Sequence, residues 1–276
     1  MIERIKENGL TGFQIKIIAL GLMVLDHIYY FFSFTGKVPL IFNQLGRIPA
    51  ALFLFMVIEG FYHTSNRKKY FLRIYSAGVL MGIVQYAIIM MGLIRGDGFY
   101  PQNNIFAAFA IIIVIMQGIE WVKEGKKAKG ILTAGFPFLV YSIVTLICPV
   151  LPQKVLSLLG IMLMTVLPIP FNAEGGIGFI VIGVVMYLFR KNQKKQIIAF
   201  IVATLIFDIG MAFIVGATWI TLFTEYFEWM EVFAAIFMCL YNGKRGKSAK
   251  KLFYIFYPAH IYLLYILSLV TFYAIY

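Results

Sequence analysis

The chain has 276 residues, of which 62% are hydrophobic and only 13% are charged, and its mean hydropathy is +0.88. A water-soluble domain of that composition would leave far too much apolar surface exposed, so the composition excludes a soluble fold. The net charge of +12 would suggest a nucleic-acid partner in a soluble protein. Here the basic residues collect in short segments between apolar stretches, as the positive-inside rule predicts, and no nucleic acid is expected.

Runs of about 20 apolar residues indicate helices that cross a bilayer. They predict an all-α fold, a polytopic membrane helical bundle with about nine to ten transmembrane helices, in which residues 1–276 form a single integral membrane domain. A shorter run, 155–167, is followed by prolines and is predicted to be a half-helix or an interfacial segment. The predicted full spans are 14–35, 47–63, 72–94, 104–122, 130–150, 175–190, 196–215, 218–240 and 253–274.

Four basic segments decide the predicted orientation in the membrane: 67–69, 123–129, 190–195 and 244–251. All four lie in the cytoplasm together with the N-terminus if the run 155–167 does not cross completely. We therefore predict a multi-pass protein of the cell (plasma or inner) membrane with a cytoplasmic N-terminus. Ten spans remain the alternative, in which one basic segment faces outward.

The first predicted span, 14–35, carries three ionisable residues, and such groups are costly in a membrane and usually mark a function. His27, preceded by Asp26, lies well inside this span. Lys16 comes eleven residues earlier, and at about 100° per residue it shares a helix face with His27, roughly 16 Å away along the axis. A phosphate-binding cation and a reactive base are thus predicted at the two ends of one face, with structural ion pairs as the alternative.

Asp26 needs a partner of its own, because neighbours on a helix point about 100° apart and Asp26 does not face His27. Arg47 opens the second span at about the depth of Asp26 in a helical hairpin, so we predict an Asp26–Arg47 ion pair. Glu59 lies near the cytoplasmic end of the second span, and His63 follows it on the same face. Two layers of charge are expected, although interfacial positions without a function remain open for Glu59 and His63.

Four acidic residues lie in the seventh and eighth predicted spans: Asp208, Glu225, Glu228 and Glu231. Few basic residues accompany them, so they are predicted to line a wet, electronegative cavity for a cationic substrate. Steps of three residues spread the glutamates over about 120° of an α-helix, which permits a common focus without requiring one. A solvated outer end of the span is the alternative.

The last predicted span contains Pro258 and His260. The proline frees a backbone carbonyl one turn earlier, and His260 is predicted to project near it, into the bundle. Arg67, Lys68 and Arg73 lead into the third span and predict a cytoplasmic anion site, with orientation by positive charge as the alternative. The sequence has no HExxH or CxxC motif, so no metal site is predicted.

Four stretches of the chain resemble the TraX family, named for the conjugal pilus protein that acetylates the N-terminus of pilin, and more distantly the acyltransferase-3 membrane family. They are residues 15–28, 45–55, 67–74 and 256–260. The first contains the basic residue, ten spacers and histidine of acyltransferase-3 proteins, here Lys16 to His27. The acid at position 26 beside the histidine follows the TraX pattern more than that of the wider family.

The resemblance implies an integral membrane acyltransferase domain, an acetyl-CoA-dependent N- or O-acetyltransferase. It would move the acyl group from acetyl-CoA on the cytoplasmic side to a peptide N-terminus, a pilin-like protein or another cell-surface acceptor. His27 would act as general base or carry the acyl group briefly, beside Asp26. The residues assigned to acyl-CoA are Lys16, Arg47, Arg67, Lys68 and Arg73. The residues assigned to the acceptor substrate are Glu59, Glu228 and His260.

Two other functions remain open from the sequence. In a cation- or proton-coupled transporter, His27, Asp26 and the acidic eighth span would form the ion path, although no inverted repeat is visible in the sequence. In a membrane assembly partner without chemistry, the ionisable groups inside the membrane would have no explanation.

Overall fold

The computed structural model describes residues 8–167, 169–170, 173–248 and 250–276. Regular structure in these residues is helical, and Leu10 and Tyr241 form an isolated β-bridge. The all-α prediction is therefore confirmed for the described part of the chain. The chain forms two compact units: the first joins Met1–Gly60 and Val185–Tyr276, and the second is Phe61–Val184.

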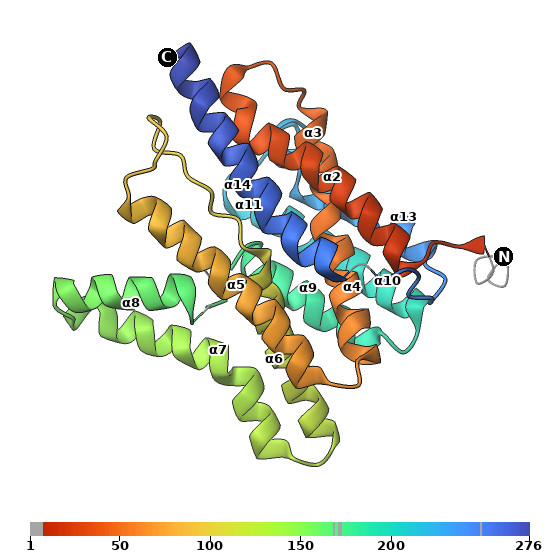
Figure 1. The fold of residues 1–276 in the computed structure, drawn as a ribbon. Coiled ribbons are helices and arrows are strands. Elements are labelled where there is room, and N and C mark those ends of the chain that lie inside the picture. The colour runs from red at the N-terminus through yellow and green to blue at the C-terminus, as the bar shows by residue number, and fades with distance from the viewer. Residues whose placement is uncertain (1–7, 168, 171–172, 249) are drawn as a thin grey trace. The chain divides into compact units, whose positions relative to one another are not determined.

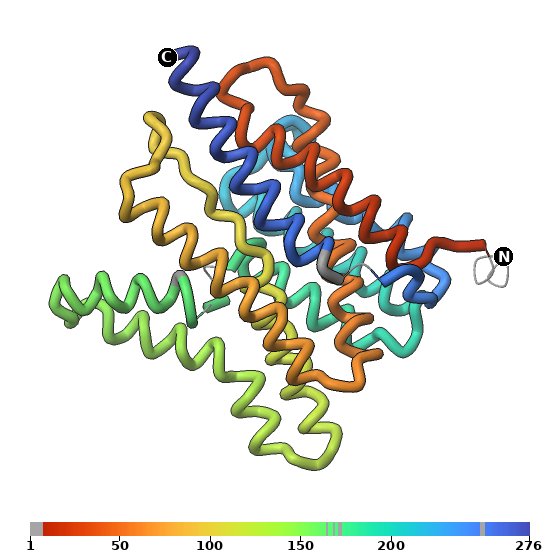
Figure 2. Tube along the Cα trace, viewed as in Figure 1, coloured from red at the N-terminus to blue at the C-terminus, as the bar shows by residue number. Residues whose placement is uncertain are grey.

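The first unit is built around two long helices from opposite ends of the chain. In Figures 1 and 2, α2 (Gly12–Phe32) and α14 (Lys250–Ile275) run side by side, and they are in contact. The short α3 (Ile41–Leu45) folds back against α2, so that a hairpin leads into α4. The other helices that lie wholly or mostly in this unit are α4 (Ile48–His63), α10 (Gln193–Thr204), α11 (Gly210–Ile214), α12 (Thr221–Thr224) and α13 (Ala234–Cys239).

The start of α2 is held at a fixed position by two sets of hydrogen bonds. Thr11 and Gln14 form a capping box, in which each side chain accepts a hydrogen bond from the backbone N–H of the other. The backbone N–H groups of Gly12 and Phe13 donate to the carbonyls of Lys244 and Arg245 at 2.9 and 3.0 Å. These N–H groups would otherwise have no partner at a helix start, so the basic segment after α13 fixes the first span.

The second unit consists of α5 (Arg67–Met90), α6 (Ile105–Lys123), α7 (Lys127–Ile147), α8 (Gln153–Thr165) and most of α9 (Gly176–Phe189). Helices α6 and α7 form a hairpin and are in contact (Figure 2). A Cβ atom built on Gly118 would come within 2.6 Å of the Gly130 carbonyl oxygen and 2.8 Å of the Ala134 Cβ. Only glycine permits this backbone approach, which is typical of membrane helix pairs.

Gly118→Ala is expected to lower the free energy of unfolding by about 1–3 kcal/mol, because the new methyl group forces α6 and α7 apart. Unfolding of the purified protein in detergent measures the loss. Gly135→Ala on α7 is the matched control, since a Cβ there meets nothing within 4 Å, and its effect should stay within about 0.5 kcal/mol. Equal effects of the two substitutions would contradict the close approach.

The predicted set of membrane spans is confirmed in part. Seven helices of the described residues are long and apolar enough to cross a membrane, where about nine to ten were predicted. The predicted sixth span is a helix, but α9 has only 14 residues, about 21 Å against a hydrocarbon core of about 30 Å. The half-helix predicted for 155–167 is confirmed as the 13-residue α8; Pro168 lies outside the described residues.

The eighth predicted span, 218–240, is wrong as a single helix. The chain there breaks into α12, a 3-10 helix over Glu228–Phe233, and α13. Thr218 and Thr221 bond each other's backbone N–H groups, and the Trp229 indole N–H donates to the Leu222 carbonyl at 2.9 Å. Side chains thus replace the backbone bonds of a continuous helix, which apolarity alone did not reveal.

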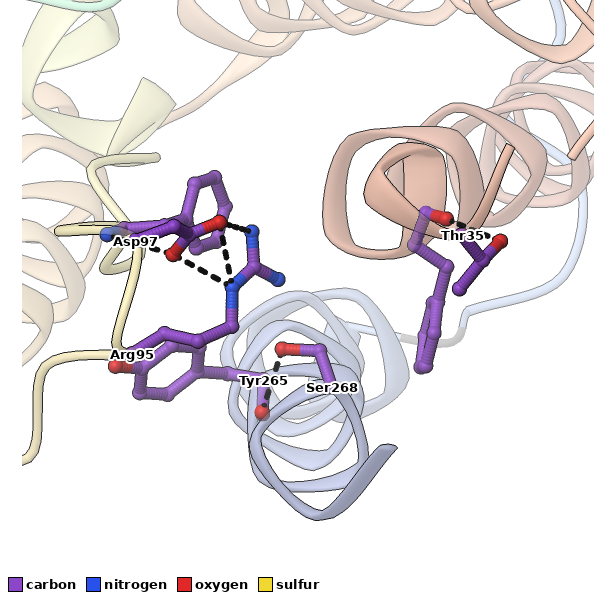
Figure 3. Close-up of polar contacts among 7 residues, drawn as sticks. Thr35, Arg95, Asp97, Tyr265 and Ser268 are labelled. Carbon is purple, nitrogen blue, oxygen red and sulfur yellow. Dashed lines mark hydrogen bonds and ion pairs between the residues drawn. The ribbon is translucent and has the colours of Figure 1, made fainter. Parts of the chain in front are cut away.

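Figure 3 shows short polar contacts in a loop, at a helix end and within a helix. In the loop between α5 and α6, Arg95 and Asp97 form an ion pair at 2.8 Å. The hydrogen bonds from Arg95 hold the pKa of the Asp97 carboxyl below its ordinary value. In the first unit, the Thr35 and Ser268 hydroxyls donate to the carbonyls of Phe32 and Tyr265, each at 2.8 Å.

Candidate active site

Two buried histidines meet inside the first unit, His27 from α2 and His260 from α14. His27 is only 3% exposed, and His260 is 8% exposed. His27 Nδ1 lies 2.5 Å from His260 Nε2, and the ring centroids are 4.8 Å apart with 24° between the planes. The contact of α2 with α14 thus joins two residues that are 233 positions apart.

Aromatic rings surround the histidine pair. The rings of Tyr30, Phe31 and Tyr257 have their centroids 6.2–6.4 Å from that of His27. The ring of Phe256 stacks on His260 with a centroid distance of 5.0 Å. This apolar shell limits water around the pair and so strengthens the hydrogen bond between the two rings.

Hydrogen-bond direction within the pair is set by a backbone carbonyl. His260 Nδ1 lies 2.7 Å from the carbonyl oxygen of Phe256, one turn earlier on α14. A carbonyl only accepts, so Nδ1 of His260 carries a hydrogen, and Nε2 of a neutral ring is then an acceptor. His27 therefore donates through Nδ1 and keeps its lone pair on Nε2, which has no hydrogen-bond partner among the described residues.

Asp26 pairs with Arg47, as the sequence predicts. Arg47 Nη2 lies 3.0 Å from Asp26 Oδ1, and the side chains are 28% and 19% exposed. Asn43 completes the arrangement, because its side-chain oxygen lies 2.5 Å from the same Nη2 and its backbone carbonyl accepts from Arg47 Nε at 3.2 Å. A Cβ on Gly46 would overlap the Asp26 carboxylate, so the glycine makes room for the ion pair.

Acidic residues from two other segments extend this polar layer. Glu228 Oε1 lies 3.7 Å from Arg47 Nη1. Glu231 Oε1 accepts from the Thr204 hydroxyl at 3.0 Å. In a 3-10 helix of three residues per turn, positions 228 and 231 share one face, and the common focus that the sequence permitted is realised for these two glutamates. Asp208 lies in a π-helical turn, Leu205–Ile209, and interacts electrostatically with both glutamates.

The residues predicted to hold acyl-CoA divide between the two units. Lys16 extends from α2 over the ring of Phe253 at the start of α14, 5.4 Å from its centroid. Lys16 and His27 therefore both face α14, in agreement with the shared helix face expected from their spacing. Arg47 belongs to the polar layer with Asp26 described above.

The other predicted cations, Arg67, Lys68 and Arg73, lie in the first two turns of α5, which begins five residues before the predicted start of that span. Arg67 Nη2 lies 3.2 Å from Glu120 Oε2, and its guanidinium carbon is 4.8 Å from the Phe61 ring centroid. Lys68 is exposed and Arg73 is half-buried. The basic cluster is thus one end of a helix in the second unit.

The structure places the predicted acceptor-binding residues at different points. His260 contacts His27, and Glu228 contacts Arg47. Glu59 lies half-buried on α4, near enough to the Tyr241 phenol for their charges to interact. Glu228 and His260 therefore belong to the polar interior of the first unit, while Glu59 lies in a separate environment.

Sequence reasoning missed three residues that shape this interior: Asn43, Gly46 and Thr204. Asn43 and Gly46 precede Arg47 by four residues and one residue, and their positions within a short polar turn before an apolar span were a usable signal. Thr204 had no signal, because a threonine inside an apolar helix usually bonds a carbonyl of its own helix.

These features define a class: a multi-pass helical membrane protein with ionisable groups enclosed in its helical bundle. Residues 11–268 match the sequence model of the family described as TraX protein, and the chain belongs to the TraX family. The resemblance to the TraX family seen in the sequence is thereby confirmed. The chain is also similar to a "Probable fimbrial assembly protein FimC, serogroup H1" of Dichelobacter nodosus, 24% identical over 264 residues that cover 92% of this chain and 94% of that protein. No solved structure matches the chain.

Proposed function

We propose that this TraX family protein is a membrane-embedded acyltransferase that moves an acetyl group from acetyl-CoA to an amine at a peptide N-terminus. The observation that supports it most is the buried histidine pair, in which a carbonyl, His260 and His27 are joined in one direction. This series of hydrogen bonds leaves a lone pair on His27 Nε2, and a general base needs such a lone pair to accept a proton.

In the proposed reaction, the nitrogen of a neutral acceptor amine attacks the thioester carbonyl of acetyl-CoA. A C–N bond forms and the C–S bond breaks, so the products are an acetylated amine and coenzyme A. His27 Nε2 takes the proton that the amine nitrogen loses and returns it to the departing sulfur. Asp26 forms an ion pair with Arg47, and this pair holds the two charges in fixed positions beside His27.

Acetyl-CoA is proposed to bind on the cytoplasmic side. Its phosphates require cations, and each unit offers a candidate set: Lys16 on α2 in the first unit, and Arg67, Lys68 and Arg73 on α5 in the second. Orientation by the positive-inside rule puts the starts of both helices in the cytoplasm. In that orientation, α9 and the broken segment between α11 and α14 also cross the membrane, although neither has the length of a regular span.

The acceptor is proposed to be a pilin-like or other cell-surface peptide. The similar Dichelobacter nodosus protein carries the name of a fimbrial assembly protein, and the TraX resemblance implies a peptide N-terminus. Incubation of the purified protein with labelled acetyl-CoA and pilin-like peptides tests this class of acceptor: label on the peptide amine is expected, and label on lipid or glycan alone would contradict it.

His260→Leu is expected to lower kcat by about 10–100-fold while leaving the KM for acetyl-CoA unchanged, because leucine cannot accept the hydrogen bond that orients His27. His260→Asn should restore part of kcat, since its amide oxygen accepts. Steady-state kinetics of label transfer measure both quantities. A general packing defect would instead lower activity equally in both variants, and that result would remove His260 as a positioning residue.

A cation- or proton-coupled transporter is the second candidate. The observation that favours it is the acidic layer, in which Asp208 Oδ2 is buried without a hydrogen-bond partner among the described residues. Acidic groups enclosed among membrane helices are typical of proton paths. Flux measurements in vesicles separate the two functions.

A further inference from the structure

We propose that a cavity inside the second unit binds a protonated primary amine. Where this inference rests on the proposed function, that amine is the acyl acceptor before it loses its proton. The cavity has a volume of about 230 Å³ and lies between α5, the start of α6 and the segment after α8. Its polar lining comes from Tyr75, Gln85, Tyr100, Gln102, Asn104 and Glu174.

Three side-chain donors of the lining already donate to backbone carbonyls. Gln85 Nε2 donates to the Asn103 carbonyl at 3.0 Å, and Asn104 Nδ2 donates to the Gly78 carbonyl at 2.9 Å. The Tyr75 hydroxyl donates to the Val166 carbonyl at 2.7 Å. The lining also offers acceptor atoms, among them Asn104 Oδ1 and the Glu174 carboxylate, and an amine N–H suits these atoms where a carbonyl or phosphate does not.

One acceptor has no partner at all in the structure. Asn104 is only 9% exposed, and its Oδ1 is buried with no hydrogen bond among the described residues. A buried amide oxygen without a partner is costly and needs an explanation. A donor that enters the cavity and reaches Asn104 supplies one.

Charge selects a cation over a neutral donor. Glu174 is the one charged side chain among the described residues that line the cavity. The whole chain carries a net charge of +12, so a described lining whose one charged residue is acidic is a local exception. Two tyrosines, Tyr75 and Tyr100, also line the cavity, and tyrosine rings attract cations. The same charge excludes the phosphates of coenzyme A, so the acyl donor needs another site.

The size of the cavity limits the ligand. Pockets for drug-sized ligands begin at about 300 Å³, and this cavity is smaller. It accommodates the end of a chain, such as an N-terminal residue with its ammonium group, and no long peptide.

The test measures binding without any acyl transfer. Thermal unfolding of the full-length protein in detergent is followed against rising concentrations of L-alaninamide, a primary ammonium, and of N-acetyl-L-alaninamide, its neutral acetylated form. A saturable rise of the midpoint is expected for alaninamide, with an at least tenfold weaker response to the acetylated compound. Equal responses to the two compounds would overturn the proposal.

Variants at the cavity sharpen the result. Gln102 is exposed at the cavity, so its replacement does not endanger the fold. Gln102→Glu should strengthen alaninamide binding several-fold, and Gln102→Lys should weaken it at least tenfold. Glu174→Gln should also weaken binding tenfold, while the same change at Glu124, which pairs with Lys126 in the loop after α6, should have no effect.

The outcomes separate this inference from the acyltransferase proposal. If alaninamide binding changes in these variants as expected but the protein transfers no acetyl group, the amine site is supported. The bound amine is then not an acyl acceptor. If Gln102→Lys and Glu174→Gln change neither acetyl transfer nor alaninamide binding, the amine site is overturned and the acyltransferase proposal stands.

Discussion

His27→Gln is expected to lower the rate of acetyl transfer by about 10²–10⁴-fold, the usual contribution of a general base. Glutamine fills most of the space of the imidazole, and its amide N–H still donates to His260 Nε2, so the fold and the contact of α2 with α14 persist. What is lost is the lone pair that takes the proton of the acceptor amine. The measurement is the transfer of label from acetyl-CoA to acceptor by purified protein.

His63→Gln is the matched control for this substitution. His63 is an exposed histidine in the last turn of α4, and its replacement should leave the rate within about twofold. Comparable activity of His27→Gln and wild type would remove His27 as the base and leave the pair a structural contact.

Arg47→Met is expected to lower the free energy of unfolding by about 2–3 kcal/mol. Breaking a fully buried ion pair costs about 3–5 kcal/mol, and the partial exposure of Asp26 and Arg47 reduces that cost. The free energy is lost because the acceptor oxygens of Asp26 and Asn43 stay among the helices and no longer have the Arg47 guanidinium as hydrogen-bond donor. Unfolding of the detergent-solubilised protein measures it.

The double variant with Asp26→Asn identifies the cause. Removing the charge of Asp26 as well should recover about 1–2 kcal/mol of the loss, as coupled neighbours do. Arg245→Met, at an exposed arginine in the loop before α14, should change stability by no more than about 0.5 kcal/mol. Additive effects of the two substitutions would show that Asp26 and Arg47 are not coupled.

Local patterns in the sequence predicted much of the first unit. The hydrophobic runs placed α2, α4 and α14 to within a few residues, because apolar length decides a membrane helix. The Asp26–Arg47 pair was predictable for a similar reason: a hairpin fixes the relative depth of two residues in consecutive helices, and an isolated charge at that depth needs a partner.

The contact between His27 and His260 was not predictable from such patterns. Each histidine stood out in the sequence because it is an ionisable residue within an apolar span. The sequence does not show which helix packs beside α2, because that is a long-range property of the fold. The direction of the hydrogen bonds depends further on the Phe256 carbonyl, where the sequence drew attention to the carbonyl freed by Pro258 instead. The position of the Phe256 carbonyl thus decides the direction of the hydrogen bonds in the histidine pair.

The broken segment after α11 shows a different limit. Apolar residues predicted one helix over 218–240, yet threonine and tryptophan side chains bond the backbone there and divide it. The 3-10 turn that results puts Glu228 and Glu231 on one face. Hydropathy measures how well a segment suits a membrane, and it does not detect local bonds that compete with a helix.

Reconstitution of the purified protein into vesicles tests the central claim most directly. Labelled acetyl-CoA is supplied with a membrane extract, and transfer of label and cation flux are followed in the same preparation for wild type and His27→Gln. The acyltransferase account predicts label on an acceptor amine, release of coenzyme A thiol, and loss of both in His27→Gln. A cation flux that depends on His27, with no transfer of label by wild type, would contradict it.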